Sequence, residues 1–370
     1  MLVVVPISLM STNCAIFEAS SKIKFERTLS LDTQFFYYME YNQDYYFDDF
    51  IRQGGAKTDQ DMKNFLSQKM FNGNKLPTQE IPFGCTSFNY SDSNGKNYHA
   101  RNYDMYRDAN CAGVIKTNPK NGYKSLSNVD FCYFGNYGYN RISQTFNDPL
   151  LDKKYEWWKA APYFALDGIN EKGLAISVNQ LYDDPSVNQT DHGQMYDLTT
   201  TTMLRNVLDH CDSVDSAIDL LRSVNLHDSI SGRYHYQISD VSGKSVVVEY
   251  DYQHNDSLVI LYPQDLKSDN DKFIANENFT LHKVNWSETD WESSWPTDRS
   301  RFDTVYTTLL ETGGVINHKL DALDLLAQAK QKATIWSTIF SLDDLTMTLR
   351  YYDERSKLDF DIYDYIYYVK

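Results

Sequence analysis

Hydrophobic and polar residues alternate most clearly in three stretches, and each stretch contains a glycine at its predicted turn. The first runs from Cys85 to Tyr103 around Asn94-Gly95, a favourable pair for a tight hairpin turn. The second, YFALDGINEKGLAISVNQL, turns between Asn170 and Gly173, and the third, YHYQISDVSGKSVVVEYD, turns at Ser242-Gly243. Each stretch predicts a pair of antiparallel strands. A further hairpin is predicted near the C-terminal end, in ATIWSTIFSLDDLTMTLRYYDER.

Apolar residues at helical spacing predict helices between and before these hairpins. The segment LTTTTMLRNVLDHCDSVDSAIDLLRSV carries two helical faces, and NHKLDALDLLAQAK carries another. DQDMKNFLSQKMF predicts a helix in the tyrosine-rich, acidic stretch 20–80 that precedes the first hairpin. Strands in hairpins, with helices inserted as blocks, indicate antiparallel sheets covered by helices, which is a layered α+β fold.

Composition and charge exclude some classes of function. The 370 residues are 42% hydrophobic and 15% aromatic, enough for the core of one large domain or two modest ones. A net charge of -16 argues against nucleic-acid binding, which depends on clustered Lys and Arg. The cysteines form no CxxC pair and lack histidines at zinc spacing, so we expect no metal site.

The first residues, MLVVVPISLMSTNC, contain an apolar run as long as a signal-peptide core, without positive residues in front of it. Residues 1–20 are therefore a possible signal segment. The alternatives are export, with secretion or a membrane tether on Cys14, and a cytoplasmic location. No later segment approaches the roughly 20 apolar residues of a membrane span.

Cys85 is the candidate nucleophile of the sequence. A cysteine at a strand start is ordinarily a small buried apolar residue. Here, however, the turn at Asn94-Gly95 folds Arg101 and Asp104 back towards the cysteine. A fixed guanidinium favours the thiolate, which is the nucleophilic form, and Asp104 could orient an amine or a proton donor.

The base for this cysteine is not evident from the sequence. His99 and His235 are not in an obvious Cys-His pair, although the sequence leaves both open. A cysteine that is the first residue of a chain can instead use its own α-amino group, whose reference pKa is about 7.7–8.0. That chemistry requires a cut between Gly84 and Cys85.

The segment CTSFNYSDSNGKNYHARNYDM resembles the start of the mature choloylglycine hydrolase family, whose members open with Cys-Thr-Ser and reach a His-x-Arg-Asn-x-Asp segment. The likeness continues in order through DGINEKGLAISVN, HYQISDVSGKSVVVEY, FIANENF, DRSRF and WSTIFSLDDLTMTLRYYD, so that it covers about Cys85 to Asp353. The family comprises N-terminal nucleophile (Ntn) hydrolases of linear amides, such as bile salt hydrolases and penicillin V acylases. Acid ceramidase and N-acylethanolamine acid amidase are related. The resemblance implies a four-layer αββα fold.

The resemblance also implies roles for particular residues. Cys85 would be the nucleophile and, through its freed amine, the base, while Arg101 would stabilise the thiolate and Asp104 would hold the α-amino group. Asn179 matches an oxyanion-hole position, with Gln180 as the alternative.

Two further residues follow from the later motifs. Asn276 in FIANENF would be the catalytic asparagine, although Ala275 and Asn278 stand where the family has Thr and Pro. Arg301 matches the last active-site arginine, and Arg299 is its competitor. We interpret His235, Asp240 and Glu249, by contrast, as structural.

The long leading segment resembles acid ceramidase and N-acylethanolamine acid amidase more than the bile salt hydrolases. We therefore expect residues 21–84 to be a partly helical propeptide or small subunit, and residues 85–370 to be the catalytic domain. The expected activity is hydrolysis of N-acyl amides such as conjugated bile salts or fatty acyl amides, without metal, cofactor or nucleic acid. The alternatives are penicillin V acylase activity, acyl transfer of the isopenicillin N acyltransferase type, and a catalytically silent binding protein. A homo-oligomer is left open.

Overall fold

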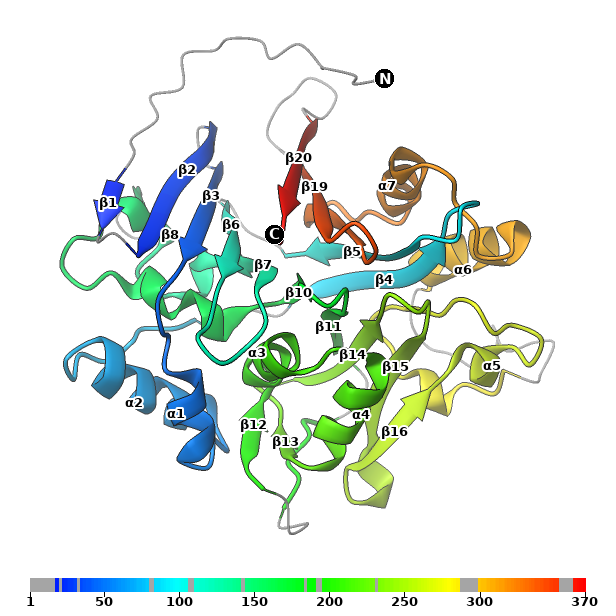
Figure 1. Ribbon diagram of the computed structural model, residues 1–370, viewed down its shortest axis with the longest axis horizontal. Helices are drawn as coiled ribbons and strands as arrows, with labels where there is room; N and C mark the ends of the chain where they lie inside the picture. The colour runs from blue at the N-terminus through cyan, green and yellow to red at the C-terminus, as the bar shows by residue number, and fades with distance from the viewer. Residues whose placement is uncertain are drawn as a thin grey trace.

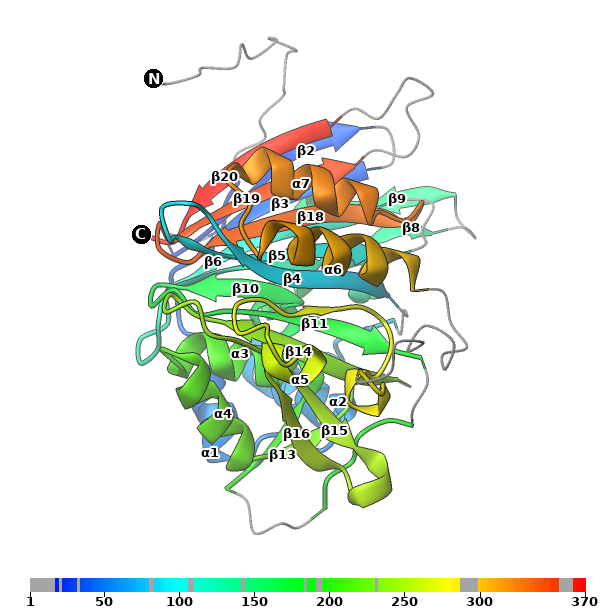
Figure 2. The same cartoon turned by 90° about the vertical axis from the view of Figure 1, so that its right-hand side faces the viewer.

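All the hairpins predicted from alternating stretches form, and they fall into two stacked sheets. The computed structural model describes residues 17–19, 22–31, 34–79, 83–105, 110–140, 144–182, 185–190, 195–229, 232–286, 299–352 and 362–370. The possible signal segment, residues 1–20, lies outside the described residues apart from 17–19. Helices cover both outer faces of the stacked sheets (Figures 1 and 2). The predicted four-layer αββα fold is confirmed.

Within the described residues, the larger sheet has ten strands in the order β1-β2-β3-β6-β7-β10-β11-β14-β15-β16. Its neighbours are antiparallel except for β3 and β6, which are parallel. The strands are β1 (Phe17–Ala19), β2 (Ile23–Leu31), β3 (Gln34–Tyr41), β6 (Asn110–Thr117), β7 (Ser125–Asp130), β10 (Asp167–Asn170), β11 (Ala175–Leu181), β14 (Arg233–Ser239), β15 (Ser245–Asp251) and β16 (Ser257–Leu261).

The smaller sheet of the described chain has six antiparallel strands in the order β17-β4-β5-β18-β19-β20. They are β4 (Gly84–Ser91), β5 (Asn97–Asp104), β17 (Ala275–Asn276), β18 (Thr334–Ser341), β19 (Thr346–Tyr352) and β20 (Ile362–Tyr368). Separate pairs are formed by β8 (Gly138–Asn140) with β9 (Thr145–Asn147), and by β12 (Asp197–Thr199) with β13 (Asn225–His227). Strand β4 packs directly on β11 and β14 of the larger sheet, so the segment that starts at Gly84 lies between the layers.

The predicted helices form the outer layers. Helices α3 and α4 pack on the larger sheet, and α6 and α7 pack on the smaller one (Figure 2). The α-helices are α1 (Phe47–Arg52), α2 (Asp59–Met70), α3 (Thr200–His210), α4 (Val214–Arg222), α5 (Pro263–Leu266), α6 (Ser300–Thr312) and α7 (Lys319–Gln328). The 3-10 helices are η1 (Phe131–Tyr133), η2 (Pro149–Leu151), η3 (Trp157–Phe164), η4 (Tyr252–His254) and η5 (Leu281–Lys283). No helix of the described residues is long and apolar enough to cross a membrane.

The leading segment is built into the larger sheet. Helix α2 forms where DQDMKNFLSQKMF predicted it: Thr58 and Asp61 make a capping box at its start, and Met62 and Leu66 are buried. The segment also supplies β1, β2 and β3, which the sequence patterns did not indicate. Strand β3 pairs along its whole length with β6 from the other side of the Gly84-Cys85 bond.

Candidate active site

Cys85 is the second residue of β4 and is fully buried. The predicted hairpin sets its surroundings, because Cys85 pairs with Tyr103 and Gly84 pairs with Asp104 across β4 and β5. Gly95 in the turn has φ +81°, a left-handed conformation that glycine adopts without strain. The turn therefore returns Arg101 and Asp104 to the end of the hairpin that holds Cys85, as expected.

The Arg101 guanidinium contacts the thiol directly. Its Nη2 donates to Cys85 Sγ at 2.9 Å, while Nη1 donates to Leu166 O at 2.9 Å and to Asp167 Oδ2 at 2.5 Å. Burial raises the pKa of the Cys85 thiol to about 12, although Arg101 opposes that rise. The thiol of the uncut chain is therefore protonated at neutral pH, and a nearby base is needed to ionise it.

Asp104 lies beside the bond that would be cut. A Cβ added to Gly84 would lie only 3.3 Å from Asp104 Cβ and Oδ2, so a side chain at position 84 would press on the carboxylate. Asp104 accepts hydrogen bonds from Arg301 Nη1 at 2.9 Å and Thr334 Oγ1 at 2.5 Å. Burial is the main reason why its pKa lies above the ordinary value, with Arg301 acting against it.

Asn278 accepts a hydrogen bond from the backbone N–H of Cys85, a role that the sequence did not indicate. Its Oδ1 accepts from Cys85 N at 3.0 Å and from Arg301 Nη2 at 2.8 Å, and its Nδ2 donates to Gln180 O at 2.6 Å. In the motif FIANENF, this asparagine stands where the family has proline. That departure from the family motif was the one feature of the sequence that could have pointed to a role for Asn278. Asn278 is thus positioned to hold the nitrogen that would become the α-amino group.

Arg301 reaches the site from α6 and contacts several of its polar groups. Besides Asp104 and Asn278, its Nη1 donates to Cys85 O at 3.2 Å, and its Nη2 pairs with the carboxylate of Glu277. The competitor, Arg299, is the residue just before α6. The structure therefore brings Arg301 to the candidate nucleophile, together with Glu277, which the sequence did not single out.

Asn179 and Asn276 lie together beside the same strand. Asn179 Nδ2 donates to Asn276 Oδ1, and Asn179 Oδ1 accepts from Ser87 Oγ at 3.0 Å. Ser87 follows Cys85 by two residues on β4, so both side chains lie on one face of that strand. The alternative residue, Gln180, makes a different contact, since its Oε1 accepts from Phe83 N at 2.8 Å.

The two histidines that the sequence left open as bases for Cys85 make hydrogen bonds to other groups. His99 lies between Ser239 Oγ and Ser177 Oγ, each at 2.9 Å, and burial lowers its pKa to about 3. His235 bonds to Glu249 Oε1 at 2.8 Å and to Glu277 O at 2.6 Å. None of these hydrogen bonds runs to Cys85. Among the described residues, no group of three or more His, Cys, Asp or Glu side chains could hold a metal ion.

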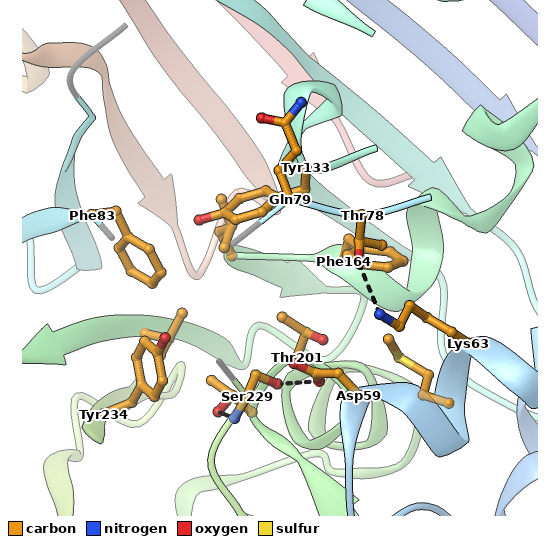
Figure 3. Close-up of a pocket in the computed structure, with 14 residues that line it drawn as sticks. Asp59, Lys63, Thr78, Gln79, Phe83, Tyr133, Phe164, Thr201, Ser229 and Tyr234 are labelled. Atoms are coloured by element: carbon orange, nitrogen blue, oxygen red, sulfur yellow. Dashed lines mark hydrogen bonds between the residues drawn. The ribbon is translucent and has the colours of Figure 1, made fainter. Parts of the chain in front are cut away.

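A pocket that is partly open to solvent lies close to the candidate nucleophile, because one of its lining residues is Val178, whose carbonyl contacts Cys85 Sγ at 3.6 Å. Leu166 and Val178 line it, and the carbonyls of these two residues bind the Arg101 guanidinium. Figure 3 shows Phe83 and Tyr234 at one end, with Asp59 and Lys63 of helix α2 at the other. The leading segment therefore contributes to both ends of the pocket.

Residues 85–262 match the family described as linear amide C-N hydrolases, choloylglycine hydrolase family. Penicillin V acylase from Agrobacterium tumefaciens is 17% identical, with 76% of this chain and 85% of that chain covered and a TM-score of 0.47. A mutant of the conjugated bile acid hydrolase from Clostridium perfringens is 16% identical, with 76% and 92% covered and a TM-score of 0.45. The Caenorhabditis elegans N-acylethanolamine-hydrolyzing acid amidase ortholog is 16% identical, with 70% and 93% covered and a TM-score of 0.42.

The family match contains the hairpins that carry Cys85, Arg101 and Asn179. The protein is an amide-hydrolysing enzyme of the Ntn class. Its residues 85–262 match the choloylglycine hydrolase family, as the motifs predicted.

Proposed function

We propose that the protein cuts its own Gly84-Cys85 bond and then hydrolyses linear N-acyl amides through a thioester on Cys85. The observation that carries this proposal is the 2.9 Å contact between Arg101 Nη2 and Cys85 Sγ, next to a pocket lined by Leu166 and Val178. Residues 21–84 would remain as a small subunit, and 85–370 would be the catalytic part.

The self-cut would use groups that already hold the scissile peptide. Gln180 Oε1 accepts from Phe83 N at 2.8 Å, and Tyr182 Oη donates to Phe83 O at 3.1 Å, so that both sides of the Phe83 backbone are fixed. Gly84 places no side chain in front of its carbonyl carbon. Attack by Cys85 Sγ on the Gly84 carbonyl would break the Gly84–Cys85 C–N bond, giving a thioester and the free Cys85 amine, which takes up the thiol proton. Water would then hydrolyse the thioester, releasing the Gly84 carboxylate and restoring the Cys85 thiol.

In turnover, the free Cys85 amine would accept the thiol proton as Sγ attacks the amide carbonyl. The resulting ammonium would protonate the leaving amine as the C–N bond breaks. The same amine would next deprotonate a water molecule that hydrolyses the thioester. Asp104 and Asn278 would hold the ammonium, and the Asn179 amide would donate to the oxyanion, a stabilisation aimed at charge that develops in the transition state.

The acyl group would enter the pocket beside Leu166, Val178 and Tyr234, which favours an apolar body. Conjugated bile salts and fatty acyl amides both meet that requirement. Phenoxyacetyl amides, which the resemblance of the motifs to penicillin V acylases implies, belong in the same substrate panel. An acyltransferase would form the same thioester and pass the acyl group to an amine, and adding an amine acceptor would distinguish it from a hydrolase.

The decisive experiment is intact mass spectrometry with N-terminal sequencing of wild type and Cys85→Ala. We expect wild type to give two pieces divided between Gly84 and Cys85, and the variant to stay whole. A cut at the same bond in the variant would assign it to another protease. Assays with conjugated bile salts, N-acylethanolamines, N-acyl amino acids and penicillin V would then identify the substrate class. A processed protein that hydrolyses none of them and resists electrophilic acyl probes at Cys85 would favour the silent binding protein.

A further inference from the structure

The pocket has an apolar end near Cys85 and a second, polar end, where the Phe164 ring lies beside the polar groups (Figure 3). Near Cys85, it is lined by Phe83, Leu166 and Val178, whereas its other end carries Asp59 and Lys63 (Figure 3). Thr78, Thr201 and Ser229 also line it. An apolar acyl chain that reached these polar groups would strip their water without replacing its hydrogen bonds, which is unfavourable.

A donor and an acceptor lie together at the polar end. Lys63 Nζ donates to Thr78 Oγ1 at 3.2 Å, and Asp59 Oδ1 accepts from Ser229 Oγ at 2.8 Å. An ammonium carries three N–H donors, and a carboxylate accepts several hydrogen bonds, so each group can bond to a ligand as well. A carboxylate on the ligand would be repelled by Asp59, and an ammonium by Lys63. A hydroxyl avoids both, because it accepts from Lys63 while it donates to Asp59.

We infer that helix α2 forms a binding site for a hydroxyl group at the end of the acyl chain remote from the scissile amide. The inference rests on the proposed function, because it takes this pocket as the acyl site. It gives the leading segment a role in substrate selection that persists after the cut. The substrate class is then an acyl amide with an apolar body and a distal hydroxyl.

The test uses processed wild-type protein and a matched pair of amides of one amine, dodecanoyl and 12-hydroxydodecanoyl. We expect kcat/KM to be about tenfold higher for the hydroxylated amide, near the lower end of what a hydrogen bond to a charged group contributes. Lys63→Met should bring the ratio of the two kcat/KM values close to one, mainly by lowering the value for the hydroxylated amide. Lys69→Met is the control, because Lys69 is an exposed lysine of the same helix outside the pocket lining and should leave the ratio unchanged.

Calorimetric binding of the two free acids to the same proteins separates this inference from the proposed function. If wild type binds 12-hydroxydodecanoate more tightly than dodecanoate and Lys63→Met abolishes this preference, the polar site is supported. If neither amide is hydrolysed in that case, the proposed function fails and the inference about the hydroxyl site stands. Equal binding and equal turnover of the pair by wild type would overturn the inference. If Lys63→Met kept the preference for the hydroxylated compound, the inference would be overturned as well, whereas continued hydrolysis of the amides would leave the proposed function standing.

Discussion

Arg101 links the candidate nucleophile to the buried frame of the site. One nitrogen of its guanidinium contacts Cys85 Sγ while the other is anchored on Leu166 O and Asp167. A lysine would keep the charge but could not make this planar forked arrangement. We expect Arg101→Lys to lower kcat/KM roughly 10-fold to 100-fold, the loss of about one hydrogen bond to a charged group.

The matched control for that variant is Arg205→Lys, since Arg205 is equally buried and pairs with Asp209 in α3, away from Cys85. Both variants replace a fully buried guanidinium that is paired with an aspartate. Activity should be measured per folded molecule, after a thermal melt of each protein. Equal activity of the two variants would make Arg101 a structural residue.

Asn179 and Gln180 are adjacent in β11 but make different contacts, which allows their roles to be separated. Loss of one oxyanion donor typically lowers kcat about 100-fold to 1,000-fold, and we expect that loss for Asn179→Ala in the processed enzyme. Gln180→Ala should mainly slow the cut at Gly84-Cys85, because Gln180 holds Phe83 N. Single-turnover assays and the rate of appearance of the processed form measure the two effects. The reverse pattern would assign the oxyanion position to Gln180.

At the scale of elements, the sequence patterns predicted the hairpins and helices, whose contacts join residues close together in the sequence. The β4–β5 hairpin is encoded by its alternation and by Asn94-Gly95, and that register alone delivers Arg101 to Cys85. Strand β3 could not be predicted in this way, because its run of aromatic residues does not alternate and its partner β6 lies about 75 positions further along the chain. The contact between Asn278 and Cys85 could not be predicted either, because the two residues are 193 positions apart in the sequence.

The hydrogen bonds of Glu249 connect β15 to the segment that carries Glu277. Its carboxylate accepts from His235 Nδ1 and His282 Nδ1, and His235 in turn binds Glu277 O. Burial favours the neutral acid, but these hydrogen bonds outweigh it and lower the pKa of Glu249 to about 2. Since Glu277 pairs with Arg301, this network also positions a residue of the candidate site.

A depressed carboxyl pKa contributes stability that is present above the ordinary pKa, 4.5, and is lost as the pH falls towards the folded value of about 2. Glu249→Gln should therefore be less stable than wild type at neutral pH, by up to about 3 kcal/mol. The difference should shrink between pH 4.5 and 2. Urea unfolding of both proteins across that range measures it, and a pH-independent difference would contradict this origin of the stability.

At the scale of the whole molecule, the two predicted pieces share one sheet. Strands β1, β2 and β3 continue the larger sheet through the pairing of β3 with β6, so a cut at Gly84-Cys85 leaves the backbone hydrogen bonds between the pieces intact. Buried aromatic residues of β3, such as Phe36 and Tyr37, add apolar contact area worth about 25 cal/mol per Å². The small piece should therefore remain bound under native conditions and separate only in denaturant.

Gly113 is the position at which this joint can be tested. It lies in β6 opposite Tyr37, and a Cβ there would approach Tyr37 O to 2.5 Å and the Phe131 ring to 2.9 Å. Gly113→Val should force β3 away from β6, so that processed variant protein loses its small piece during gel filtration while wild type keeps it. Combining Gly113→Val with Cys85→Ala supplies the control: the uncut chain cannot dissociate, so a folded double variant attributes the loss to the joint rather than to misfolding. Retention of the small piece by processed Gly113→Val would show that the β3–β6 pairing does not hold the pieces together.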